Sequence, residues 1–143
     1  MYQLITIAGN VGKDAEMRYT PNGKAVASFN VATNSQYTNN NGEVIKETTW
    51  FRVTTWGKQA EICNQYVKKG MKVLVVGKLT ADPATGGPRI WSAQDGSPHT
   101  AFEINADTVR FLNKAGETSH ESNSDIPGES HPATAPSEDE FPF

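Results

Sequence analysis

The chain has 143 residues, of which 36% are hydrophobic, and its formal net charge is −3. Its single cysteine, Cys63, excludes a disulfide framework and a thiolate metal cluster, and no apolar run approaches the roughly 20 residues of a membrane span. The N-terminus has neither the basic stretch nor the apolar stretch of a secretory signal, so we expect a cytoplasmic protein.

The charge is unevenly distributed along the chain. Residues 1–112 hold twelve Lys and Arg and nine Asp and Glu, which gives a net charge of +3. Residues 113–143 hold one Lys and seven acidic residues, which gives −6. A mildly basic body followed by an acidic tail favours a domain that binds polyanions and carries a separate interaction segment.

The first half of the chain predicts antiparallel strands separated by turn signals. The strands cover residues 4–9, 25–34 and 44–56, and the turns lie at 20–23 (TPNG) and 39–42 (NNNG). We expect Gly9 to end the first strand and Gly57 to end the third.

The second half adds one helix and three further strands. The helix is predicted over residues 58–69, with Ile62, Cys63, Tyr66 and Val67 on its apolar face and two lysines in its last turn. A strand over 71–80, a loop over 81–88 and a last hairpin of 89–94 with 100–112 follow. This order predicts an all-β protein with one short helix, a five-stranded OB-fold barrel with extended hairpins.

The strand over residues 49–56 (TWFRVTTW) carries the strongest functional signal. Side chains alternate along a strand, so Trp50, Arg52 and Trp56 share one face, while Phe51 and Val53 share the other. Two indoles with a guanidinium between them suit unstacked nucleobases, because stacking is worth about 1–3 kcal/mol per base and ignores sequence. The alternative is that both faces are buried and the tryptophans belong to the core.

Other chemistry has little support in the sequence. No Gly-Lys pair has the spacing of a phosphate-binding loop, and the three histidines are scattered, so we expect no catalytic site, no metal and no cofactor. Cys63 reads as an apolar packing residue, and Tyr66 as a core or interface residue rather than a nucleobase platform. Asp14 and Glu16 flank a predicted turn, where solvent is their expected environment.

The pattern of strands stops near Asn113. Residues 113–137 are rich in Ser, Glu, Pro and Gly, and Ile126 is their only aliphatic residue larger than Ala, so we predict a disordered linker. The chain then ends in residues 138–143 (EDEFPF). This segment is either a solubilising tail or a short linear motif, in which the acids steer Phe143 into an apolar pocket beside a cation.

Three segments resemble the bacterial-type single-stranded DNA-binding protein family. They are residues 7–23 (IAGNVGKDAEMRYTPNG), 49–61 (TWFRVTTWGKQAE) and 138–143 (EDEFPF). The resemblance implies an OB-fold domain in residues 1–112 that binds and protects single-stranded DNA independently of sequence, and assembly into a homotetramer. It further implies a disordered linker over 113–137 and a terminal tip over 138–143 that recruits replication, recombination and repair proteins, in a cytoplasmic, nucleoid-associated setting.

The resemblance also implies a role for individual residues. Aromatic residues that match the base-stacking positions are Trp50, Trp56, Trp91 and Tyr37. Basic residues expected to contact the DNA backbone are Arg52, Lys58, Lys72 and Arg18. Residues of the tip expected to bind partner proteins are Asp139, Glu140, Phe141, Pro142 and Phe143.

The chain departs from the family pattern in two places, and two other functions stay open. Residues 82–89 look like an insertion before Trp91, and the linker is short, which reduces the reach of the tip. One alternative is an RNA-binding OB module of the cold-shock type, which also uses strand aromatics but is shorter and lacks the acidic tip. The other is a protein-interaction scaffold, in which Trp50 and Trp56 would be buried.

Overall fold

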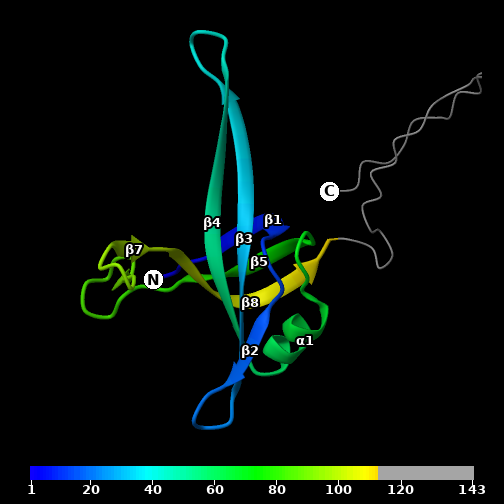
Figure 1. Ribbon diagram of the computed structural model, residues 1–143. Coiled ribbons are helices and arrows are strands. Elements are labelled where there is room, and N and C mark those ends of the chain that lie inside the picture. The colour runs from blue at the N-terminus through cyan, green and yellow to red at the C-terminus, as the bar shows by residue number, and fades with distance from the viewer. Residues whose placement is uncertain (113–143) are drawn as a thin grey trace, which may run out of the picture.

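The computed structural model describes residues 1–112. The elements of this region are, in chain order, β1 (Ile5–Val11), β2 (Glu16–Tyr19), β3 (Ala25–Thr38), β4 (Val44–Trp56), α1 (Lys58–Tyr66), β5 (Lys72–Leu79), β6 (Ile90–Ser92), β7 (Pro98–Thr100) and β8 (Phe102–Phe111). The strands β3 and β4 form a long hairpin whose end projects well beyond the rest of the molecule (Figure 1).

Five strands close into a barrel, as the sequence predicts. The order β1-β5-β8-β4-β3 returns to β1 through a short antiparallel pairing of Asn10 with Ala32 and of Val11 with Val31. The strand β4 pairs antiparallel with β3 over its full length and parallel with β8 over four residues. Closure leaves few free strand edges, which is how small antiparallel barrels of the OB type protect their backbone groups.

The first strand does not end at Gly9, contrary to the prediction. It continues to Val11, and Gly9 sits where β1 crosses β3. A methyl group at Gly9 would overlap the carbonyl oxygen of Ala32, so only glycine allows the two backbones to approach this closely. The glycine therefore marks the point where the barrel closes.

The barrel interior is filled by alternate strand residues and is covered at one end by α1. Its largest fully buried apolar side chains are Phe29, Ile104, Val31, Val53, Val67, Val73 and Val75, whereas Val26, which is also buried, lies outside this cluster. Cys63 is also fully buried, and desolvation raises the pKa of its thiol more than a hydrogen bond with Thr55 lowers it. The prediction that Cys63 is a packing residue is confirmed.

The helix differs from its prediction in length and in its apolar face. It ends at Tyr66, and Val67 already has an extended backbone. Ala60, Cys63 and Val67 face the barrel, whereas Ile62 and Tyr66 are exposed, and the Tyr66 ring lies 6.1 Å from that of Phe111. A nine-residue helix docks on the barrel through one narrow stripe, which leaves its other apolar residues in solvent.

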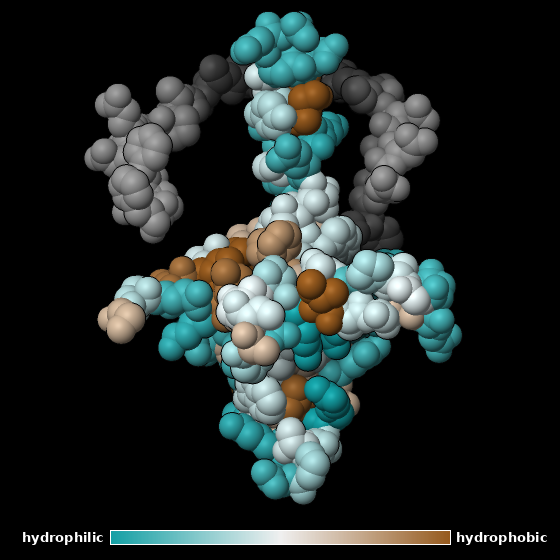
Figure 2. Space-filling view, turned by 90° about the vertical axis from the view of Figure 1, so that its left-hand side faces the viewer, coloured by the Kyte–Doolittle hydropathy of each residue, from teal (hydrophilic) through white to brown (hydrophobic). Residues whose placement is uncertain are grey.

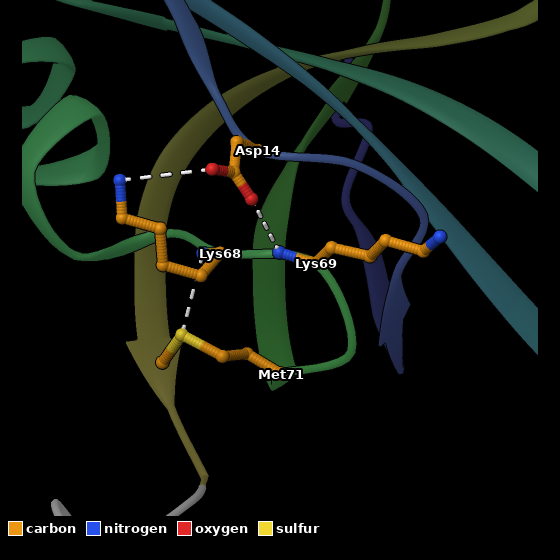
Figure 3. Close-up of polar contacts among 4 residues, drawn as sticks. All are labelled: Asp14, Lys68, Lys69 and Met71. Carbon is orange, nitrogen blue, oxygen red and sulfur yellow. Dashed lines mark hydrogen bonds and ion pairs between the residues drawn. The ribbon is translucent and has the colours of Figure 1, made fainter.

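Asp14 has a structural role that the sequence analysis did not assign to it. One of its carboxylate oxygens accepts a hydrogen bond of 2.8 Å from the backbone N–H of Lys69, and the other lies 3.8 Å from Lys68 Nζ (Figure 3). The predicted helical lysines thus lie in the turn after α1, where the Lys68 N–H also contacts the Met71 sulfur at 3.3 Å. Asp14 joins the β1–β2 connection to the α1–β5 turn.

The last predicted hairpin is divided between two sheets. The strand β6 pairs only with β7, in a separate two-stranded sheet, while β8 leaves this hairpin at Phe102 and pairs with β4 and β5 inside the barrel. The strand β2 has no counterpart among the sequence predictions, and it pairs with the first residues of β3. Both differences follow from barrel closure. The strand β8 pairs with β4 on one edge and with β5 on the other, and β2 pairs with the part of β3 that β1 does not reach.

We predict that Gly9→Ala lowers the free energy of unfolding by about 1–3 kcal/mol, because the added methyl group meets rigid backbone at the β1–β3 crossing. Urea denaturation measures the change. The matched control is Gly87→Ala, where the nearest atom, Thr85 Oγ1, lies at an ordinary 3.7 Å and the expected change is within about 0.5 kcal/mol. Equal stability of the two variants would contradict the close approach.

Candidate nucleic-acid interface

The outward side of β4 carries the predicted aromatic residues. We call Trp50, Arg52, Thr54 and Trp56 the β4 face. Trp50 is 53% exposed and Trp56 is 39% exposed, whereas the alternating Val53 and Thr55 are fully buried. The predicted alternation is confirmed, and the alternative in which both faces of the strand are buried is wrong.

The indole of Trp50 lies against a glycine from another strand connection. A Cβ atom placed on Gly12 would stand 2.6 Å from Trp50 Cζ3, so the ring occupies the space that a side chain at position 12 would fill. The Gly12 N–H donates a hydrogen bond of 2.9 Å to the carbonyl of Asn30, and Asn30 is the register partner of Arg52. The backbone of β3 thus holds Gly12 beneath the indole.

The indole of Trp56 is fixed by two polar neighbours. Its Nε1–H donates a hydrogen bond of 2.8 Å to Asn105 Oδ1 on β8, and Lys24 Nζ lies 5.5 Å from the ring centroid. The hydrogen bond sets the ring orientation, and the ammonium is attracted by the π-face. Sequence analysis missed Gly12, Lys24 and Asn105, because only the strand register brings them to these rings.

The charge next to the β4 face is mainly positive. The β8 register partner of Arg52 is Glu103, which is 7% exposed and bound to Arg89 at 2.6 Å. Because Arg89 already pairs with this carboxylate, the Arg52 guanidinium is left to bind another anion. Within residues 1–112, no ion pair involves Arg52, Arg18 or Lys58.

The structure brings the other predicted basic residues near the two ends of the β4 face. Arg18 pairs in register with Val26, which pairs with Trp56, and Lys58 begins α1 two residues after Trp56. Lys72 pairs with Asn10, which pairs with Ala32, the partner of Trp50. Lys72 therefore lies in the same row as Trp50, three strand spacings or roughly 14 Å away.

The two remaining aromatic residues lie apart from the β4 face. Tyr37 is 52% exposed on the projecting part of β3, and its register partner is Ile45. On β3 the partners of Trp50 and Thr48 are Ala32 and Asn34, so alternation places Tyr37 on the opposite side of the ribbon. Tyr37 therefore lies beyond the barrel and does not share the β4 face.

Trp91 lies on β6 and is 41% exposed. Arg89, two residues before it, connects the start of this hairpin to Glu103 and so to the row of Arg52. The predicted insertion closes on itself ahead of this hairpin, since the Asp82 N–H donates to the Gly87 carbonyl at 2.9 Å and the Gly86 N–H donates to the Asp82 carbonyl at 2.8 Å.

Some predictions concern parts of the chain or chemistry away from this face. The predicted linker and the tip residues, Asp139 to Phe143, lie outside the described residues. Among residues 1–112, no group of three or more His, Cys, Asp or Glu is arranged to hold a metal ion. No helix in the same region has the length and apolar character to cross a membrane.

The closed barrel with one helix defines the chain as an OB-fold protein, and comparison with known proteins defines it further. Residues 2–112 match the model of the Single-strand binding protein family, and the chain belongs to this family. The resemblance inferred from the sequence is thereby confirmed.

Individual relatives show the same likeness. The chain is 36% identical over 115 residues to the single-stranded DNA-binding protein of Neisseria meningitidis (strain Z2491), covering 80% of this chain and 62% of that relative. It is 33% identical over 116 residues to the protein of the same name from Wolinella succinogenes, covering 81% of this chain and 67% of the relative. The chain thus spans less than two thirds of the Neisseria protein.

A solved structure is similar over the same region. It is a Plasmodium falciparum SSB in complex with ssDNA, with a TM-score of 0.65 and 25% sequence identity. The similarity covers 79% of this chain and 97% of that one.

We predict that Gly12→Ala displaces the Trp50 indole while the barrel stays folded, because Gly12 is not among the positive-φ glycines and the added methyl meets only the end of a side chain. The indole N–H resonances in a proton–nitrogen NMR spectrum report the change. The Trp50 resonance should shift and that of Trp91 should stay in place, and an unchanged Trp50 resonance would contradict the packing described.

Proposed function

We propose that this protein binds single-stranded DNA independently of sequence and protects it during replication, recombination and repair. The observation that carries the proposal is the β4 face, where two exposed indoles flank an arginine with no carboxylate partner in residues 1–112. The family match and the names of the relatives support it.

The chemistry follows from the side chains of this face. Trp50 and Trp56 are six residues apart, or roughly 20 Å, so a strand of unstacked nucleotides between them would meet an aromatic ring at each end and Arg52 in the middle. Every base has a π-face, so stacking ignores sequence, while Arg52, Lys58, Lys72 and Arg18 would neutralise phosphates. Salt should weaken binding only moderately if stacking dominates.

Trp91 and Tyr37 would extend the binding path away from β4. Both rings are exposed, one on the β6–β7 hairpin and one on the projecting β3–β4 hairpin. Because neither ring lies on β4, contact with both would need a DNA strand that curves over the barrel rather than one that lies along a single strand.

We further propose that the protein assembles into a homotetramer. Along β1, the pairing with β3 involves only Asn10 and Val11, so residues 5–9 present a strand edge on that side. An uncovered edge invites pairing with another chain, and a second copy would cover it. Figure 2 shows hydrophobic residues gathered on one side of the barrel body, while the tip of the projecting hairpin is hydrophilic.

The terminal residues Asp139, Glu140, Phe141, Pro142 and Phe143 are proposed to recruit replication, recombination and repair proteins. The support is the sequence alone, an acidic segment that ends in Phe-Pro-Phe and resembles the tip of the family. Acids would steer the segment to a basic patch, and Phe143 would enter an apolar pocket.

A fluorescence titration tests the central proposal. Addition of oligo-dT of increasing length should quench the tryptophan emission and saturate at a defined length, and a matching duplex should not. Oligo-rU of the same length separates DNA binding from the RNA-binding alternative. An absence of quenching by all three would favour the interaction scaffold instead.

We predict that Trp50→Ala and Trp56→Ala each weaken binding to oligo-dT by about 1–3 kcal/mol, because each variant removes one stacking platform. Fluorescence anisotropy of labelled oligo-dT measures the dissociation constants. Tyr66→Ala, which removes an aromatic ring that is as exposed as Trp50 but lies on α1, is the matched control and should bind like the wild type. A loss of similar size in this control would point to general destabilisation.

We predict that deletion of Phe143 abolishes capture of partner proteins and leaves the affinity for oligo-dT unchanged, because the tip and the β4 face are separate in sequence. A pull-down from a replication-competent extract, run beside the anisotropy assay, measures both. Capture of the same partners by the truncated protein would contradict the proposed role of the tip.

A further inference from the structure

The β6–β7 hairpin carries a second aromatic ring next to Trp91. His99 is the register partner of Trp91, and the two ring centroids lie 6.2 Å apart with an interplanar angle of 27°. Both residues are exposed. The hairpin lies at the left of Figure 1, on the side that Figure 2 turns toward the viewer.

Hydrogen bonds fix the orientation of the imidazole. Ser97 Oγ lies 2.6 Å from Asp95 Oδ1 and 3.0 Å from His99 Nε2. Hydrogen bonds from the hydroxyl and the backbone N–H of Ser97 hold the pKa of the Asp95 carboxyl below its ordinary value, so the carboxylate only accepts. The single hydroxyl proton therefore goes to Asp95, and Ser97 Oγ accepts a hydrogen bond from the His99 Nε2–H.

This arrangement leaves Nδ1 as the site where His99 takes up a second proton. The resulting imidazolium would keep its Nε2–H hydrogen bond to Ser97, which in turn donates to the Asp95 carboxylate. It would also contact the Trp91 indole as a cation. Imidazoles change charge between about pH 5 and 8.

Few charged groups surround His99 within residues 1–112. The paired strand β6 holds no titratable residue, and the turn contributes Asp95 alone. The next charged residues along the chain on either side are Arg89 and Glu103, which are paired with each other at 2.6 Å. Uptake of a proton by His99 would thus change the net charge of the hairpin from −1, set by Asp95, to zero.

We propose that His99 is a DNA-contacting residue that makes the affinity of the Trp91 hairpin for single strands depend on pH. The inference rests on the proposed function. The imidazole lies beside the Trp91 ring, which is proposed to stack on a base, and its protonated form would add a cation next to that ring. Affinity for single-stranded DNA therefore rises as the pH falls through the range in which the imidazole becomes charged.

The test measures the dissociation constant of labelled oligo-dT from about pH 8 to about pH 5.5 with the full chain, since thymine does not titrate in this range. The wild type should gain about two- to fivefold more affinity than His99→Gln over this range, the size expected of one exposed ion pair. His99→Lys, which is charged throughout, should bind tightly at both ends. The two histidines of the tail, His120 and His131, are present in all three proteins and cancel in the comparison.

Salt dependence provides the second readout. At about pH 5.5 the slope of log affinity against log salt should be steeper for the wild type than for His99→Gln by about 0.7, which is one phosphate contact on a single strand. Identical pH profiles and identical slopes for the wild type and His99→Gln would overturn the role of His99. A failure of the wild type to prefer oligo-dT over duplex at any pH would instead overturn the proposed function itself.

The stack itself is checked in a protein in which Trp50 and Trp56 are replaced by Phe, so that only Trp91 emits. A protonated imidazole beside an indole quenches its fluorescence, so acidification of the free protein should dim this variant and leave the same variant with His99→Gln unchanged. Emission that does not respond to pH in either protein would contradict the stacked geometry.

Discussion

The position of β4 between β3 and β8 is the constraint on which the rest of this structure depends. Hydrogen bonding on both edges holds the strand in one register, and burial of Val53 and Thr55 decides which of its faces is turned inward. A shift of β4 by one residue would bury Arg52 and expose Val53. The lost apolar burial would cost about 1.5–3 kcal/mol per side chain, and a charge would be left in the core. The core therefore orients the β4 face.

Groups that do not belong to this face hold its rings in place. The space above Gly12 accommodates the Trp50 indole, and Asn105 and Lys24 hold that of Trp56. Rings fixed before a ligand arrives lose little conformational freedom on binding, which favours affinity. The same reasoning applies to the β6–β7 hairpin, where His99 and the Asp95–Ser97 turn restrict Trp91.

Two acidic residues of the domain are held in local ion pairs with basic side chains. Glu103 beside Arg52 is neutralised by Arg89, and Asp14 is bound to the turn of Lys68 and Lys69. Arg52, Arg18 and Lys58 have no carboxylate partner in the described region. The small net positive charge of residues 1–112 is therefore carried in part by side chains that can bind an anion.

The sequence by itself determined the positions of β1, β3, β4 and β5 along the chain, the single helix and the two faces of β4, because alternation and turn residues are local properties that a chain displays in order. It also pointed to Trp50, Arg52 and Trp56, which share one strand. Only the tertiary structure decided that Gly9 closes the barrel, that β8 leaves its hairpin to pair with β4 and β5, and that Tyr37 lies away from the β4 face. The partners Gly12, Asn105 and His99 came from the structure alone, because contacts between strands depend on a register that no single segment of the sequence specifies.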